Sequence, residues 1–121
     1  MKDKYVLIIE DSKNESDAVS AYLEKLGVEY KVAVNGTDAL RLAQETPPVL
    51  MLMDLMLPGL NGFKLIHLLK SDDKLKEVPI IVMSILNGEN NKSMAKELGA
   101  IEYLVKPLQP GEFADMLKKY L

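Results

Sequence analysis

The sequence of 121 residues contains no cysteine and only one histidine. Without cysteine, the chain has no disulfide, no thiolate nucleophile and no cysteine-ligated zinc site. A single histidine also excludes a histidine-rich metal site. His67 falls within a predicted helix, and we interpret it as an ordinary helix residue. Any metal or nucleophile chemistry in this chain must therefore use other side chains.

The sequence also lacks a strong charge of one sign and a long apolar run. The 15 Lys and Arg and 18 Asp and Glu give a net charge of −3, so there is no basic stripe for nucleic acid. The apolar run near the N-terminus, Tyr5–Ile9, is too short for a signal peptide or a membrane span. No Gly-x-x-x-x-Gly-Lys loop for nucleotide phosphates is present. We therefore expect one cytoplasmic domain over residues 1–121 that binds neither nucleic acid nor membrane directly.

Short apolar runs recur along the chain and predict five strands: Tyr5–Ile9, Tyr30–Val34, Val49–Met53, Pro79–Met83 and Ile101–Val105. The first, third and fourth runs are apolar throughout, which is typical of strands buried on both faces of a parallel sheet. The second and fifth contain Lys31 and Glu102, and such charges are easier to accommodate at a sheet edge.

The segments between these runs have helical periodicity and recognisable ends. Ser12 to Glu15 forms a capping-box pattern that opens the first helix, and Gly27 follows its apolar stripe as a stop. Gly99 closes the fourth helix, and Pro110 opens the fifth. Strands that alternate with helices five times indicate an α/β domain with a parallel sheet.

Polar side chains follow the ends of the predicted strands: Glu10 and Asp11 after the first, Asp54 after the third, Ser84 after the fourth and Lys106 after the fifth. Ligands of such sheets bind at the carboxyl ends of the strands. Each residue alone fits a cap, a turn or the surface. Together, however, three carboxylates repel one another and need a cation, and an all-oxygen set favours Mg²⁺.

This constellation resembles the receiver domain of two-component response regulators over residues 4–121. The motifs are the pair Glu10-Asp11, the lone Asp54, the turn Leu57–Gly62, Ser84 and the pair Lys106-Pro107. The resemblance implies a flavodoxin-like, doubly wound α/β fold, in which a five-stranded parallel sheet of order 2-1-3-4-5 is flanked by five helices. It also implies a phosphorylation-controlled signalling switch rather than an enzyme.

The resemblance assigns roles to the acidic residues. Asp54 matches the phosphoacceptor, which receives a phosphoryl group from a partner histidine kinase or histidine phosphotransfer protein. Asp11, Asp54 and the backbone carbonyl of Met56 match direct Mg²⁺ ligands, and Glu10 acts through a bound water.

The remaining site residues match phosphoryl-binding and switch positions. Lys106 pairs with the acceptor carboxylate and then with phosphoryl oxygens, while Ser84 and Tyr103 move together. Pro107 follows the lysine through a bond that the family usually holds cis. Ile85 stands where the family usually has Ala or Gly, and we expect it to crowd the phosphoryl pocket or slow water entry. The implied output surface, where a downstream effector binds, comprises the fourth helix, fifth strand and fifth helix.

Three alternative functions compete with the switch. An interaction module that no longer takes phosphate usually loses the acceptor or an acidic-pair residue, and this chain keeps all three. A flavin-binding domain needs an uncharged loop where Glu10 and Asp11 stand, and an aspartyl-phosphate phosphatase commonly has a second Asp at the position of Met56. The sequence favours the switch. It leaves open the kinase, the output, the oligomeric state, and whether the domain stands alone or belongs to a longer regulator.

Overall fold

The computed structural model describes residues 4–121, so the first three residues of the predicted domain lie outside the described part. Within it, the strands are β1 (Val6–Ile9), β2 (Tyr30–Ala33), β3 (Leu50–Met53), β4 (Ile80–Ser84) and β5 (Glu102–Val105). The helices are α1 (Lys13–Lys25), α2 (Gly36–Glu45), α3 (Gly62–Lys70), α4 (Glu89–Leu98) and α5 (Pro110–Tyr120). Each predicted strand is present with its ends within one residue of the prediction. Ser84, predicted to follow β4, is its last residue.

The five strands form one parallel sheet of order β2-β1-β3-β4-β5, which confirms the predicted order. β2 and β5, the strands with internal charges, lie at the two edges as predicted. The strand order reverses at β1: β2 lies on one side of β1, and β3 to β5 follow on the other. The loops that follow β1 and β3 therefore diverge and open a crevice at the carboxyl ends of these two strands. This crevice is where the polar residues of the two strand ends meet.

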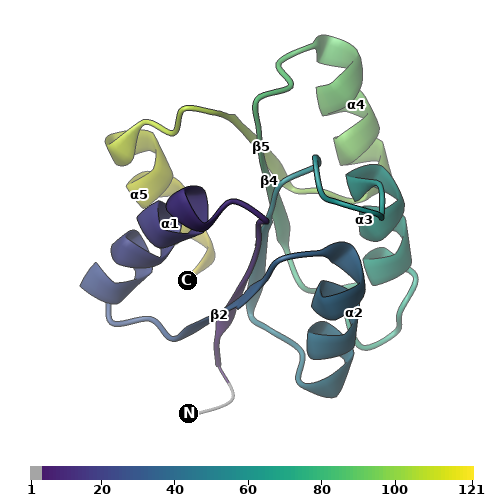
Figure 1. The fold of residues 1–121 in the computed structure, drawn as a ribbon, viewed down its shortest axis with the longest axis horizontal. Coiled ribbons are helices and arrows are strands. Elements are labelled where there is room, and N and C mark those ends of the chain that lie inside the picture. The colour runs from purple at the N-terminus through teal and green to yellow at the C-terminus, as the bar shows by residue number, and fades with distance from the viewer. Residues whose placement is uncertain (1–3) are drawn as a thin grey trace.

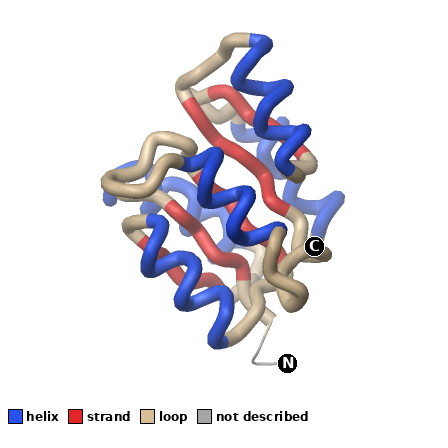
Figure 2. Tube along the Cα trace, turned by 90° about the vertical axis from the view of Figure 1, so that its right-hand side faces the viewer, coloured by secondary structure: helices blue, strands red, loops and turns tan. Residues whose placement is uncertain are grey.

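Helices cover both faces of the sheet, with α1 and α5 on one side and α2, α3 and α4 on the other (Figures 1 and 2). Successive residues of the central strands face opposite layers: Leu7 packs in the core beneath α2, α3 and α4, whereas Ile8 packs beneath α1 and α5. Both residues are fully buried, as expected for strands covered on both faces. None of the helices within residues 4–121 combines the length and the apolar character that crossing a bilayer requires.

The start of α1 differs from the predicted capping box. The Ser12 side chain accepts a hydrogen bond from the Glu15 backbone N–H at 3.4 Å, as the pattern predicts. The second half of the box is wrong, because the Ser12 N–H donates to Glu10 Oε2 at 3.2 Å, and the Glu15 carboxylate pairs with Lys106 instead. A buried ammonium competes more strongly for the glutamate than a backbone N–H does. Gly27, with φ of +69°, follows α1 as predicted.

Candidate functional site

Four of the predicted site residues come together at the carboxyl edge of the sheet. The backbone ladder continues one residue beyond the strands: the Asp54 N–H donates to the Ile9 carbonyl at 3.0 Å, and the Lys106 N–H donates to the Ser84 carbonyl at 2.8 Å. Glu10, directly after β1, is therefore held beside Asp54. All of these side chains are largely buried.

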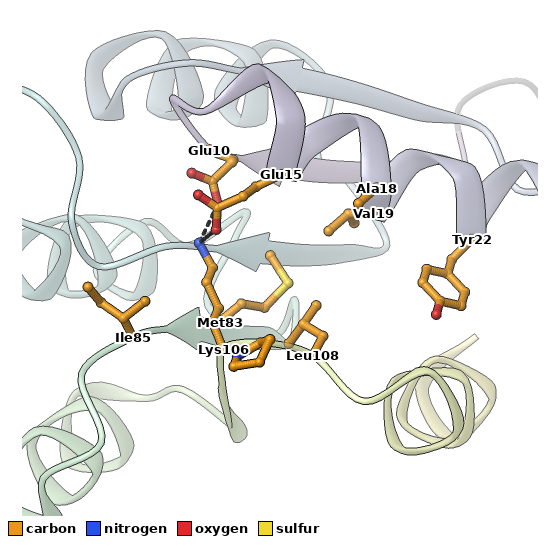
Figure 3. A pocket seen from close by; sticks show the side chains of 10 residues that line it. Glu10, Glu15, Ala18, Val19, Tyr22, Met83, Ile85, Lys106 and Leu108 are labelled. Carbon is orange, nitrogen blue, oxygen red and sulfur yellow. Dashed lines mark hydrogen bonds and ion pairs between the residues drawn. The ribbon is translucent and has the colours of Figure 1, made fainter.

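The ammonium of Lys106 lies at the centre of the site. Its Nζ is 2.8 Å from Asp54 Oδ2. It is also 2.8 Å from Glu10 Oε1 and forms a third ion pair with Glu15, and Figure 3 shows both glutamates at the ammonium. Burial alone would lower the pKa of Lys106, but its hydrogen bonds to Asp54, Glu10 and Glu15 outweigh burial and raise that pKa well above its ordinary value. The lysine is therefore a permanent positive charge in this site.

The two buried carboxylates are fixed through both of their oxygens. Asp54 Oδ1 accepts a hydrogen bond from the Met56 N–H at 2.9 Å, and Glu10 Oε2 accepts one from the Ser12 N–H. Burial raises the pKa of Glu10, and its hydrogen bond with Lys106 opposes that increase. These contacts hold the Asp54 carboxylate in one orientation.

An acidic group that could hold a metal ion lies in the same place. Carboxylate oxygens of Glu10, Glu15 and Asp54 are all within 4.8 Å of one another. Three carboxylates and one ammonium leave a formal charge of −2, which a divalent cation balances, and hard oxygen ligands suit Mg²⁺. The residues present therefore fit the predicted ion.

The metal set predicted from sequence differs from this group at two positions. Asp11 is exposed and is not among the three converging carboxylates, so its role as a metal ligand stays a prediction. Glu15 belongs to the group, although the sequence suggested only a capping role for it. Its position in the first turn of α1, the helix that begins at this edge of the sheet, is the signal that could have identified it.

The predicted switch residues share one partner in the β4–α4 loop. Ser84 Oγ accepts a hydrogen bond from the Leu86 N–H at 3.2 Å, and the Tyr103 hydroxyl donates to the Leu86 carbonyl at 2.6 Å. Tyr103 is partly buried, and burial raises the pKa of its hydroxyl. A movement of Ser84 that displaced Leu86 would therefore break the hydrogen bond that holds Tyr103. Whether the residues act in this way stays a prediction.

A cavity of about 510 Å³ opens beside the cluster, between α1 and the segment after β5. Its walls are mostly apolar, and Lys106 reaches its acidic end (Figure 3). Ile85 is 63% exposed and lies at the edge of this cavity. Its expected effect on the phosphoryl pocket stays a prediction. The Lys106–Pro107 bond is cis, as the resemblance implies.

The fold and this site define a doubly wound α/β domain with an acidic, lysine-containing centre at its topological switch point. The model of the response regulator receiver domain family matches residues 6–118. PilH of Pseudomonas aeruginosa is 38% identical over 103 residues, which cover 85% of each chain.

Solved structures give the same result. Chemotaxis protein CheY4 of Vibrio cholerae matches with a TM-score of 0.89 at 29% identity, over 98% of both chains. The receiver domain of sensor histidine kinase PA1611 from Pseudomonas aeruginosa, solved with a magnesium ion coordinated in the active site cleft, has a TM-score of 0.87 at 25% identity, over 97% of this chain and 95% of that one. The chain belongs to the receiver domains of two-component response regulators, and its class of function is phosphorylation-based signalling.

Proposed function

We propose that Asp54 accepts a phosphoryl group from a partner histidine kinase or histidine phosphotransfer protein. The observation that supports this most directly is the setting of its carboxylate, which is 10% exposed and bound to the Lys106 ammonium at 2.8 Å. An isolated aspartate at a strand end has no such partner. The chain acts as a phosphoacceptor, with no enzymatic activity beyond slow loss of its own phosphoryl group.

The reaction is a transfer between two anionic groups. A carboxylate oxygen of Asp54 forms the new bond to phosphorus, the bond between phosphorus and the donor breaks, and its electron pair leaves with the donor group. Lys106 neutralises charge on the acceptor and then on the phosphoryl oxygens. Asp11, Asp54 and the carbonyl of Met56 would hold Mg²⁺ directly, and Glu10 would hold it through a bound water; the ion would supply additional positive charge.

The proposed output is a change in the surface formed by α4, β5 and α5, where a downstream effector binds. Two features support this surface. Tyr103 on β5 is tied to the β4–α4 loop through Leu86. In addition, α4 buries only Ala95, and its N-cap Gly88 provides no side-chain hydrogen bond. A helix with so few anchoring contacts can move at a small cost in free energy.

Mass spectrometry tests the acceptor. Incubation with acetyl phosphate and Mg²⁺ should add one phosphoryl group to the wild-type protein and none to Asp54→Asn. Asp115→Asn, on the exposed surface of α5, makes the same chemical change away from the site and should be phosphorylated normally. Phosphorylation that persists in Asp54→Asn contradicts the assignment. A wild-type protein that takes no phosphoryl group is an interaction module instead.

Amide chemical shifts test the output. Beryllofluoride, a mimic of the phosphoryl group, should shift amides from Ser84 through Tyr103 as well as those beside Asp54. Tyr103→Phe removes the hydroxyl that bonds to Leu86, so the shifts in β5 should become smaller while those beside Asp54 remain. Shifts confined to the loops after β1 and β3 would show that the signal does not reach this surface.

A further inference from the structure

The Lys106 ammonium has no free donor for a phosphoryl group. An ammonium carries three N–H bonds. Glu10 and Asp54 each accept a hydrogen bond from Lys106, and Glu15 pairs with the same nitrogen as the third carboxylate. An incoming phosphoryl oxygen that binds this nitrogen before the bond to Asp54 forms must therefore displace one of the three carboxylates. The structure shows which of them can leave.

Two of the carboxylates are held in place. Glu10 is 1% exposed, and its second oxygen accepts a hydrogen bond from the Ser12 N–H at 3.2 Å. Asp54 is the proposed acceptor, and its second oxygen is bound by the Met56 N–H at 2.9 Å. Until the bond between Asp54 and phosphorus forms, both are ionised, and releasing either one would leave a charged group buried without its partner, which is costly.

Glu15 differs from both. Its side chain is 46% exposed, and its carboxylate has no hydrogen-bond or ion-pair partner other than Lys106 within residues 4–121. It extends from the first turn of α1, whose backbone is fixed by buried residues further along, including Val19 and Leu23. The carboxylate can therefore turn into solvent by side-chain rotation alone, with α1 left in place, and water then replaces the lost ion pair.

We propose that Glu15 is an internal competitor of the phosphoryl group, a positioning residue that occupies the third donor of Lys106 until a phosphoryl oxygen takes its place. This inference rests on the proposed function, because it requires that Lys106 bind the oxygens of a phosphoryl group at Asp54. Glu15 makes the empty site less attractive to anionic donors in two ways. It uses the third N–H of Lys106, and it adds one negative charge beside Glu10 and Lys106 (Figure 3).

Beryllofluoride affinity tests the competition without requiring a phosphoryl transfer. The dissociation constant is measured by amide shifts at Mg²⁺ concentrations shown to saturate each variant. Glu15→Gln keeps the size of the side chain and removes its charge, and it should bind beryllofluoride about two- to fivefold more tightly, the range expected for a half-exposed ion pair. Glu15→Ala removes the competing acceptor entirely and should bind at least as tightly.

Glu112→Gln is the matched control. Glu112 is an exposed glutamate in the first turn of α5, so the substitution makes the same change in net charge and in helix-terminal charge. Its affinity should stay near that of the wild-type protein. Raising the ionic strength should narrow the difference between Glu15→Gln and wild type, because salt screens an exposed charge. With acetyl phosphate, Glu15→Gln should be phosphorylated faster than the wild type at low donor concentration and at nearly the same rate at saturating donor concentration.

The outcomes separate this proposal from the proposed function. Equal affinities in wild type, Glu15→Gln and Glu112→Gln would overturn the competitor role and leave the phosphoacceptor intact. Weaker binding by both Glu15 variants would also overturn it, because Glu15 would then assist the bound group. If neither wild type nor any variant binds beryllofluoride, the proposed function fails and the competitor role fails with it. The amide spectra report in the same experiment that each variant is folded.

Discussion

Replacing Lys106 by methionine should make the protein much less stable at neutral pH. The lysine side chain is 10% exposed and bonds to two buried carboxylates. Methionine has a similar length but no charge, so Glu10 and Asp54 would remain buried beside each other without a cation. Glu15, being half exposed, can turn into water.

The size of the effect follows from this inventory. Removing one partner from a buried ion pair costs about 3–5 kcal/mol of the free energy of unfolding. We expect about 3 kcal/mol, the lower end of that range, since one of the three carboxylates can escape to solvent. For a domain of 121 residues, this corresponds to a melting temperature lower by about 12 °C.

The loss in the free energy of unfolding of Lys106→Met should also depend on pH. Burial already raises the pKa of Glu10 in the wild-type protein, with the hydrogen bond to Lys106 opposing it, so loss of the lysine should raise that pKa further. A group whose pKa is higher in the folded state stabilises that state when protonated and loses this contribution as pH rises. The difference between Lys106→Met and wild type should therefore shrink as the pH falls from about 7 to about 5.

Urea denaturation at several pH values without Mg²⁺ measures the deficit. Lys119→Met is the control, because the Lys119 side chain is 65% exposed and its ion pair with the Glu102 carboxylate, at 3.5 Å, is long. Its loss should cost less than about 1 kcal/mol, with little dependence on pH. Similar losses in Lys106→Met and Lys119→Met, or a deficit that grows as the pH falls, would refute the reasoning.

Three further predictions concern the surroundings of Asp54. Gly62→Ala should destabilise the protein by about 1–3 kcal/mol in urea denaturation, because a Cβ at this position would lie 2.5 Å from the Leu55 backbone. Gly111→Ala should not, because a Cβ at position 111 would have no neighbouring atom within 4 Å among residues 4–121. Mg²⁺ at ten times its dissociation constant should stabilise the wild type by about 1.4 kcal/mol in thermal unfolding, and Asp11→Ala should lose most of that gain; an undiminished gain would exclude Asp11 as a ligand. Ile85→Ala should lose its phosphoryl group about twofold faster at unchanged stoichiometry, and equal decay would leave Ile85 without this role.

The local sequence carried most of the information about the fold. Apolar runs without alternation, such as Val6–Ile9 and Leu50–Met53, are typical of strands covered on both faces, and both runs are fully buried strands here. Charges within the second and fifth runs placed those strands at the edges. Polar residues directly after the strands then had to meet at the carboxyl edge of a parallel sheet, which is why the sequence could predict that Glu10, Asp54 and Lys106 lie together.

The partners of those residues were decided by the tertiary structure. Lys106 and Glu10 are 96 residues apart, and their 2.8 Å contact depends on the register of the whole sheet. The tertiary structure brings Glu15, in the first turn of α1, to Lys106, and it leaves Asp11 exposed although Asp11 directly follows the buried Glu10. Sequence determines which groups reach this edge, because strand periodicity is local. It does not determine which carboxylate each N–H of the lysine binds, because that pairing depends on burial and charges that elements far apart in the sequence contribute.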